Sequence, residues 1–297
     1  MGAGRPRPAR IVTAVPELRP MRADDVAAAH ELTFAAFADL DRRLQVPESP
    51  RSDPEAAYVR LRRILATDPR GCWVAEDGAG LAGVGLALLR ESVWGLSLLV
   101  VRPDLQSAGI GSALLSRTLE HGADARGWII LASPDSRALR AYVRAGFALH
   151  PAVMATGVPR AAVGCADVRL FEPGDHELAA EVDRAVRGAP HGEDLDALAA
   201  GGCELLTLPG RGYAAHRAGA VKTVAAFDDE AAGALLRTAL ARGRGGAQAQ
   251  VEWMTGDQQW AIDVAVAARL ELRLAGAVCL RGDVGSFRPY LPGGAYL

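Results

Sequence analysis

Hydrophobic residues near the start of the chain recur at the spacing of two amphipathic helices. A short strand-like segment at 17–21 is followed by Asp24 and Asp25, and acidic residues of this kind commonly cap the first turn of a helix. The apolar stripe after them, with steps of three and four residues, consists of Val26, Ala29, Leu32, Ala36 and Leu40. A second stripe predicts a helix over 54–66.

Strand-like runs come next, and further along they alternate with helical patterns. The pattern predicts strands at 72–76, 81–89, 93–101 and 128–132, helices at 112–121 and 135–144, and a further strand that begins at 147. Strands that first meander and then alternate with helices are typical of a mixed α/β domain. We expect this domain to end near residue 158.

The second half of the chain repeats this order of elements with little sequence identity. It predicts strands at 167–170, 203–208, 212–217, 221–227, 249–254 and 275–281, and helices at 175–186, 229–241 and 258–269. The matching order indicates a duplicated domain, with 154–166 as a linker. We therefore predict an α/β fold of two tandem domains, each with a central mixed sheet flanked by helices. The predicted divisions are a mobile arm at 1–15, domains at 16–158 and 159–282, and a Pro/Gly-rich tail at 283–297.

Composition and charge narrow the classes of partner. The chain has 297 residues, of which 50% are hydrophobic and 23% charged, so a large core can be buried and wholesale disorder is excluded. The formal net charge of −2 supplies no excess of positive charge to attract nucleic acid or an anionic membrane. We therefore expect neither as a partner.

Targeting signals and metal-ligand patterns are missing from the sequence. No apolar run approaches the roughly 20 residues of a membrane span, and the basic first ten residues have no apolar stretch behind them. Cys72, Cys165, Cys203 and Cys279 lie far apart, without a CxxC pair or a histidine at ligand spacing. These features predict a cytoplasmic protein with reduced thiols and no structural metal.

One glycine motif matches a nucleotide-binding pattern by letter only. Residues 78–83 read GAGLAG, which fits the GxGxxG fingerprint. That fingerprint needs a helix directly after the glycines, because the N-terminus of the helix holds the pyrophosphate. Here the strand-like run VGLALL follows, so we interpret the glycines as a hairpin turn.

A second glycine-rich segment, 98–115, has the right context for an anion. An apolar strand ends at Val101, and the residues from Gln106 to Gly111 open a helix. Glycines let the main chain approach a ligand closely, and the N–H groups of a first helical turn are unpaired, so together they favour a pyrophosphate. An ordinary tight strand-to-helix connection is the alternative for this loop taken alone.

The next strand and helix carry a tyrosine at a telling position. A strand at 129–132 leads into Ser133, Pro134 and Asp135, and the helix after them ends at Gly146. Tyr142 lies three and four residues after Leu139 and Ala138, so it shares their face of the helix. A tyrosine packed in the core is the alternative reading.

Together the two segments resemble the GNAT superfamily of acyl-CoA-dependent N-acyltransferases. The resemblance lies in V-x-P-x-x-Q-x-x-G-x-G at 101–111 and in D-x-x-A-x-x-x-Y-x-x-x-G-F at 135–147. Asp135 stands where the family usually has asparagine. The elements over about 17–155 also come in the expected order, so the resemblance covers the first half of the chain.

The resemblance implies a mode of cofactor binding and a direct acyl transfer. The main chain of β-structure at 99–101 would pair with the pantetheine arm of acetyl-CoA, the co-substrate, and the N–H groups of 107–112 would hold its pyrophosphate. The implied cofactor-binding residues are Leu99, Val100, Val101, Gln106, Ser107, Ala108, Gly109, Ile110, Gly111, Ser112 and Asp135. Tyr142 would protonate the departing thiolate, and a main-chain N–H, such as that of Val101, would stabilise the oxyanion.

The general base is less defined by the sequence. Many family members carry a glutamate on the strand before the loop, but the segment 94–98 reads WGLSL and has none. Glu91, just before that strand, is the nearest carboxylate, and we take it as the candidate base. An exposed hairpin residue is the alternative for Glu91, and Ser97 or Ser133 could position a water instead.

The second half departs from the motifs at the matching points. Asp228, Asp229 and Glu230 follow the strand where Gln-x-x-Gly-x-Gly is expected, and these carboxylates would cap the helix and repel a pyrophosphate. Aligning Asp257 with Asp135 places Val264 where Tyr142 stands. We predict a degenerate copy that binds no CoA. The tail at 283–297 either reaches the acceptor pocket or packs on the surface.

The resulting hypothesis is an N-acetyltransferase with one active site in the N-terminal domain. Its partner would be a small-molecule or peptide amine, with the acceptor wall built from the two helices of 24–66 and the hairpin loop at 90–94. A catalytically inactive acyl-CoA-binding regulatory or scaffold protein is the alternative from another class. The alanine-rich helices are also compatible with a homodimer.

Overall fold

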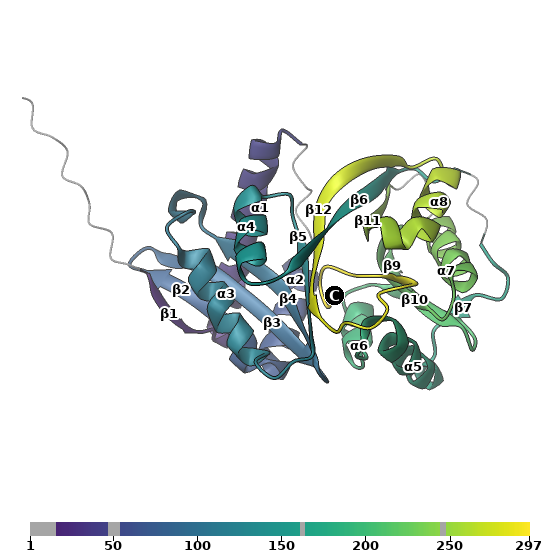
Figure 1. Ribbon diagram of the computed structural model, residues 1–297, viewed down its shortest axis with the longest axis horizontal. Coiled ribbons are helices and arrows are strands. Elements are labelled where there is room, and N and C mark those ends of the chain that lie inside the picture. The colour runs from purple at the N-terminus through teal and green to yellow at the C-terminus, as the bar shows by residue number, and fades with distance from the viewer. Residues whose placement is uncertain (1–15, 47–53, 161–163, 244–247) are drawn as a thin grey trace, which may run out of the picture.

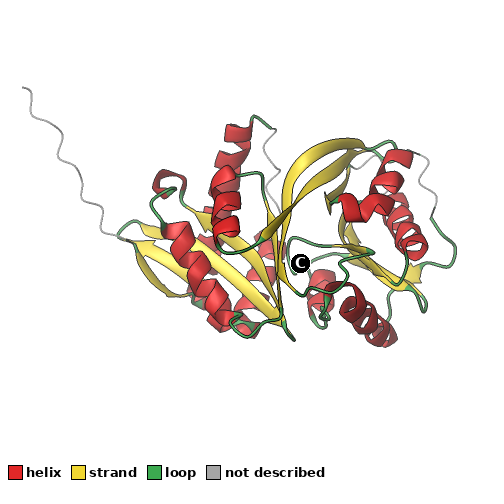
Figure 2. Cartoon of the chain, in the orientation of Figure 1, coloured by secondary structure: helices red, strands yellow, loops and turns green. Residues whose placement is uncertain are grey.

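The computed structural model describes residues 16–46, 54–160, 164–243 and 248–297 (Figure 1). The predicted arm at 1–15 lies outside the described residues, as does the middle of the predicted linker at 161–163. In the described part of the chain, helices lie on the outside of a long curved layer of strands (Figure 2). None of the helices within these ranges is both long enough and apolar enough to cross a membrane.

The first half contains the predicted alternation of strands and helices. Its elements are β1 (Glu17–Pro20), α1 (Val26–Leu44), α2 (Pro54–Thr67), β2 (Cys72–Asp77), β3 (Gly80–Arg90), β4 (Val93–Val101), α3 (Ile110–His121), β5 (Gly127–Ala132), α4 (Ser136–Arg144) and β6 (Ala148–Gly157). The glycines at 78–83 lie in the turn of the β2–β3 hairpin and at the start of β3, so the hairpin prediction is confirmed.

The second half repeats this order with one additional short strand at its end. Its elements are β7 (Arg169–Leu170), α5 (His176–Arg187), α6 (Asp194–Ala200), β8 (Glu204–Leu208), β9 (Gly212–Arg217), β10 (Ala220–Ala226), α7 (Asp229–Arg242), β11 (Ala249–Met254), α8 (Gln259–Ala267), β12 (Glu271–Gly282) and β13 (Tyr290–Leu291). The sequence pattern did not predict α6 or β13. Both are too short to show a period of their own.

One side-chain arrangement opens both halves in the same way. Arg19 donates to both carboxylate oxygens of Asp25 at 2.7 and 2.8 Å, and Arg169 donates to both oxygens of Asp175 at the same two distances. In each case the aspartate also accepts a main-chain N–H from three residues earlier. The repeated geometry supports the duplication inferred from the order of elements. Asp25 therefore fixes the entry to α1 rather than capping its first turn.

Among the described residues, the strands of both halves join into one thirteen-stranded mixed sheet. Its order is β1-β2-β3-β4-β5-β12-β6-β11-β10-β9-β8-β7, with β13 paired to β10 off this path. β12 from the second half lies between β5 and β6 of the first, and β6 in turn pairs with β11. Figure 1 shows β6 and β12 as the long strands at the junction. The predicted domains are consecutive segments of the chain, whereas strand pairs of the sheet cross the boundary between these segments.

The predicted linker begins too early. β6 continues to Gly157, and in it Val153, Ala155 and Thr156 pair with both β11 and β12, while Met154 pairs with β12. Pro151 is accommodated beside a bulge in β12, where Ala275 and Gly276 have no partner in β6. The segment from Met154 is therefore part of the central sheet, because its main-chain groups are satisfied by strands from the other half.

Helices cover both faces of the first half of the sheet. Ala29, Leu61 and Ile64 from α1 and α2 pack on the face that carries Val74 and Val84. Ile110 and Leu114 from α3 pack with Ala75 and Ala82 on the opposite face. Ala75 follows Val74 in β2 and so points to the other side, and Ala82 is the extra residue of a bulge in β3. These packed layers hold β4 and the start of α3 in fixed positions, and the candidate site lies where the two meet.

Candidate active site

Strands β4 and β5 part in the middle of β4. They pair in parallel from Val93 with Gly127 to Leu96 with Ile130, and no pairing follows. On its other edge β4 remains paired with β3 as far as Val101, with a bulge at Ser97. Arg102 N–H bonds to Ala82 on the β3 side, so the N–H of Val101 points toward the gap, since successive N–H groups alternate between edges. The gap thus exposes main-chain groups of β4 to a ligand.

The loop after β4 presents the start of α3 beside this gap. The side chain of Gln106 donates to the main-chain oxygen of Val101 at 3.1 Å and ties the loop to the end of the strand. Ser107 and Gly109 have positive φ values of 69° and 89°. Gly109 stands at the N-cap, and no side chain caps the helix. The first-turn N–H groups of α3 are therefore left without a side-chain cap.

Tyr142 lies on α4 and lines the same cavity as the gap. Its side chain is 5% exposed and packs in a cluster with Trp94, Phe147 and Ile130. Burial raises the pKa of Tyr142, with smaller contributions from Cys279 and Asp135, so the phenol stays protonated at neutral pH. Within the described chain its hydroxyl has no protein hydrogen-bond partner. Tyr142 is thus a core residue whose protonated side chain also lines the cavity.

Asp135 caps α4 and is held by two arginines. Its carboxylate accepts the main-chain N–H of Arg137 at 2.9 Å and the guanidinium of the same residue at 2.8 Å. Arg43 from α1 donates to it at 3.2 Å. Burial opposes ionisation, but these hydrogen bonds outweigh it, and the pKa of Asp135 lies below its ordinary value. Asp135 therefore remains a carboxylate, and its main visible role is to fix the start of the helix that carries Tyr142.

Glu91 does not reach the cavity. It lies in the turn between β3 and β4, where its side chain is 47% exposed and accepts from Arg184 of α5 at 2.9 Å. The cavity lining does not include it. The candidate base from the sequence is thus replaced by its alternative, an exposed hairpin residue. The physical reason is that the turn points toward the second half, a neighbour that local sequence pattern does not reveal.

A cavity of about 1370 Å³ joins the two halves. Most of the implied cofactor-binding residues line it, namely Leu99, Val100, Val101, Gln106, Ser107, Gly109, Gly111, Ser112 and Asp135. Ala108 and Ile110 do not, and Ile110 instead packs under α3. Helices α1 and α2, which the sequence analysis assigns to the acceptor side, also contribute residues to the lining. The hairpin loop at 90–94 is not part of the lining.

The C-terminal tail lines this cavity rather than packing on the surface. Residues 292–296 contribute to the lining, and Tyr296 is 3% exposed. The hydroxyl of Ser97, at the bulge of β4, donates to the main-chain oxygen of Ala295 at 2.7 Å. Leu297 is buried against Gly95, and its main-chain oxygen accepts from Tyr290 at 2.6 Å. The tail therefore reaches the point where β4 and β5 part.

In the second half, protein groups fill the positions that correspond to the gap beside β4 and to the uncapped start of α3. The carboxylate of Asp228 accepts the N–H of Ala231 at 2.9 Å and caps α7, as predicted. β10 and β11 pair at one position only, Ala220 with Gln250. β13 then pairs with β10 along Val224 and Ala225, on the edge that β9 leaves free. The chain thus fills with its own tail the position that corresponds to the gap beside β4.

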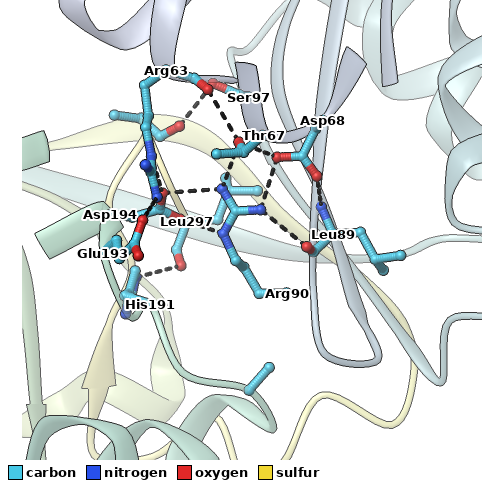
Figure 3. Close-up of polar contacts among 12 residues, drawn as sticks. Arg63, Thr67, Asp68, Leu89, Arg90, Ser97, His191, Glu193, Asp194 and Leu297 are labelled. Carbon is cyan, nitrogen blue, oxygen red and sulfur yellow. Dashed lines mark hydrogen bonds and ion pairs between the residues drawn. The ribbon is translucent and has the colours of Figure 1, made fainter. Parts of the chain in front are cut away.

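A buried ionic cluster fixes the two halves to each other (Figure 3). Arg90 at the end of β3 contacts both Asp68, at 2.8 Å, and Asp194 of the second half, at 2.6 Å. Arg63 of α2 also contacts Asp194 and Glu193, at 3.4 and 3.0 Å. The Asp194 side chain is fully buried, so its charge depends on these arginines. The cluster holds α2 and α6 together beside the cavity.

Sequence reasoning missed the charged residues that the second half contributes to the cavity. Lys222 from β10, Glu252 from β11 and Arg273 from β12 all line it. Lys222 is the only lysine among the 33 Lys and Arg residues of the sequence. This is unusual enough to notice, but it does not indicate where the side chain lies in the fold. No local pattern brings these strands near β4, because the placement follows from strand pairing between the halves.

Comparisons with known proteins agree with the geometry. The model of the acetyltransferase (GNAT) family matches residues 36–147, which hold the β4 gap, α3 and α4. A search by sequence against curated proteins found no match.

Solved structures resemble the whole chain. A proposed acetyltransferase from Pyrococcus horikoshii is 16% identical, with 99% of each chain covered and a TM-score of 0.75. A GCN5-related N-acetyltransferase from Sphaerobacter thermophilus is 17% identical, with 90% of this chain and 95% of that chain covered and a TM-score of 0.58. A tandem GNAT protein from the clavulanic acid biosynthesis pathway is 14% identical, with 90% and 98% covered and a TM-score of 0.56.

At these identities, the similarity to solved structures shows the fold alone. The family is indicated by the sequence match, which covers residues 36–147. The predicted mixed α/β architecture of two tandem halves is confirmed. Residues 36–147, within the N-terminal half, match the acetyltransferase (GNAT) family.

Proposed function

We propose that the protein is an N-acetyltransferase that moves the acetyl group of acetyl-CoA to a primary amine, with one active site in the N-terminal half. The observation that carries the proposal is the gap where β4 and β5 part after Leu96 and Ile130, directly beside the uncapped start of α3. This arrangement offers main-chain groups to an extended amide-bearing arm and N–H groups to a pyrophosphate.

The residues around the gap fit the parts of acetyl-CoA. The main chain of 99–101 pairs with the pantetheine arm, and the N–H groups of 107–112 bind the pyrophosphate. Arg137, Arg140 and Arg144 line the same cavity from α4, and their positive charges favour the phosphates further. In the described part of the second half, the equivalent positions are filled, because Asp228 caps α7 and β13 occupies the edge of β10.

The chemistry is a direct transfer. The neutral amine attacks the thioester carbonyl carbon, a C–N bond forms, and the C–S bond then breaks. The departing sulfur takes the phenolic proton of Tyr142, and the proton lost from the amine nitrogen restores the balance through solvent. Burial keeps the phenol protonated until the thiolate forms.

A calorimetric titration with acetyl-CoA, followed by an assay of amine-dependent CoA release, tests the proposal. We expect about one acetyl-CoA per chain, in line with a single open site, and CoA release only when an amine is present. A second bound equivalent would contradict the degenerate role of the second half. Binding without release, for every amine tested, would favour the inactive acyl-CoA-binding protein instead.

A further inference from the structure

The cavity lining has a strongly basic part, the basic end, outside the residues implied in cofactor binding. Arg60 from α2, Arg217 from β9, Lys222 from β10 and Arg273 from β12 line it, and Glu252 from β11 is the one carboxylate among them. Within the described residues, no salt bridge joins any of these five side chains to a charged group, although Lys222 lies near enough to Glu252 to interact with it electrostatically. Arg217 bonds to the main-chain oxygen of Gly201, and Arg273 only approaches the sulfur of Met154.

The absence of ion pairs here contrasts with the surrounding structure. Arg19, Arg90, Arg102 and Arg169 each contact a carboxylate at 2.7 Å or less. An unpaired charge in a partly buried site lowers stability unless a ligand or water compensates it. The basic end of the cavity therefore has charge left over for a ligand to neutralise.

The side chains of Lys222 and Glu252 are positioned by irregularities of the main chain. Lys222 is the extra residue of a bulge in β10, between the paired positions Val221 and Thr223. Glu252 lies in a second bulge, in β11, where the next residue, Trp253, has a φ of 63°. Bulges and left-handed residues of this kind re-aim side chains and are common at functional sites. Both side chains line the cavity as a result.

The tail connects these groups to the reaction site. Gly293 lies against the main-chain oxygen of Lys222, and a Cβ at this glycine would overlap it. Two residues further on, Ala295 accepts the hydrogen bond from Ser97 beside the gap. Lys222 is thus separated from the β4 gap by three residues of tail, a span of about 10 Å for extended chain.

The tail segment also carries an unpaired hydroxyl, on Tyr296, the residue after Ala295. The Tyr296 hydroxyl is buried without a hydrogen-bond partner in the described chain. Arg60 lies close enough to interact with it electrostatically, and burial lowers the pKa of Arg60 because it disfavours the charge. A buried donor and a buried cation without partners both gain from an anionic group.

Burial acts on Glu252 in the opposite sense. It raises the pKa of Glu252, with a smaller opposing effect from Lys222 and a hydrogen bond from Gln250. A cationic ammonium group beside Glu252 would stabilise the carboxylate form. A substrate with positive charge only, such as a diamine, would meet four cations and one carboxylate at this end of the cavity and would be repelled.

We propose that the acceptor is a small amine that also carries an anionic group, either a carboxylate or a phosphate. Lys222 and Arg60, with the Tyr296 hydroxyl, bind the anion, and Glu252 binds the ammonium group before transfer. This inference rests on the proposed acetyl transfer and names the class of its acceptor. It makes the second half, which has no cofactor site of its own, a determinant of acceptor specificity.

A panel of matched amines tests the inference. ω-Amino carboxylates are compared with their amides, phosphoethanolamine with ethanolamine, and both sets with diamines. The readouts are kcat/KM for CoA release and calorimetric binding of each amine to the protein saturated with CoA. We expect kcat/KM and affinity to be at least about 10-fold higher for the anionic members, as expected for a charge-assisted contact. The two anionic sets distinguish carboxylate from phosphate.

Variants identify the groups responsible. Lys222→Met should reduce the preference for anionic over uncharged amines by about 10-fold, while affinity for acetyl-CoA stays unchanged. Arg70→Met removes an exposed cation that does not line the cavity and should leave the preference intact. Equal kcat/KM for charged and uncharged members, or a preference for diamines, would overturn the acceptor class and leave acetyl transfer standing.

Binding separates this inference from the proposed function. Selective binding of anionic amines that depends on Lys222, without any turnover, would sustain the ligand class and reject acetyl transfer. Lack of any difference in binding between anionic and uncharged amines would overturn the ligand class, whether or not CoA is released.

Discussion

Arg90 forms a bidentate ion pair with Asp194, with Nε–Oδ2 at 2.6 Å and Nη2–Oδ1 at 3.0 Å, across the junction of the two halves. Because the Asp194 side chain is fully buried, its loss leaves arginine charge uncompensated. We expect Asp194→Asn to lower the free energy of unfolding by about 3 kcal/mol, measured by urea denaturation.

The neighbouring glutamate supplies a matched control for this variant. Glu193 contacts Arg63 at 3.0 Å, but its side chain is 77% exposed. Glu193→Gln should therefore change the free energy of unfolding by less than about 1 kcal/mol. Similar losses in the two variants would show that the buried pair does not hold the halves together.

The other carboxylate of the cluster makes stability depend on pH. Burial alone would raise the pKa of Asp68, but hydrogen bonds from His121, Thr67 and Arg90 outweigh it and lower that pKa from 3.8 to about 2. A carboxylate with a depressed folded pKa stabilises the fold fully above its unfolded pKa and loses this contribution as pH falls through the folded pKa. We expect a loss of about 2 kcal/mol from this group between about pH 4 and pH 2.

Urea denaturation over that pH range measures the effect. Asp68→Asn should start from a lower free energy of unfolding and show a shallower fall in acid, because the titrating group is gone. An unchanged slope in the variant would assign the acid sensitivity to other carboxylates.

Tyr142 tests the acid step. Tyr142→Phe keeps the ring in its apolar cluster and removes only the hydroxyl, so acetyl transfer should fall by about 10²-fold or more while acetyl-CoA affinity stays the same. Initial rates and calorimetry measure the two quantities. Glu91→Gln serves as a comparison, because its side chain lies outside the cavity and its rate should stay within about twofold of the parent. A large loss of rate in Glu91→Gln would indicate that Glu91 takes part in the reaction.

The start of α3 tests the anion site. Ser112 lines the cavity in the first turn of the helix, and Ser116 is exposed one turn later without lining it. Ser112→Glu places a negative charge beside the pyrophosphate and should weaken acetyl-CoA binding by at least about 10-fold. Ser116→Glu should have little effect. Since an acidic residue favours a helix N-terminus, the loss would not come from unfolding.

The local elements of the fold followed from periodicity and motif. The predicted bounds of β4, β9 and β11 agree with the structure residue for residue, and α1, α3 and α4 begin within two residues of their expected starts. The gap, the uncapped helix and Tyr142 all lie within about 50 residues of sequence, so their placement depends on short connections. The features that the family motif describes are therefore readable from the chain.

Contacts between the halves were not readable. Glu91 was expected near the thioester and instead pairs with Arg184, 93 residues away in sequence. Lys222 and Glu252 gave no local signal, because their positions depend on bulges and on the pairing of β6 and β12 with strands of the other half. The sequence left open whether the tail reaches the cavity or packs on the surface. Its position depends on the free edge of β10, with which β13 pairs.

The sequence alone determined most of the order of elements, the glycine-containing loop after β4, the position of Tyr142 on α4 and the absence of that loop motif from the second half. Each of these depends on residues close together in the chain. Only the tertiary structure decided that the second half forms the basic end of the cavity and that the tail links it to β4. The reason is that strand pairing and burial join residues more than 100 positions apart, such as Ser97 and Ala295, and no local pattern encodes such a pairing.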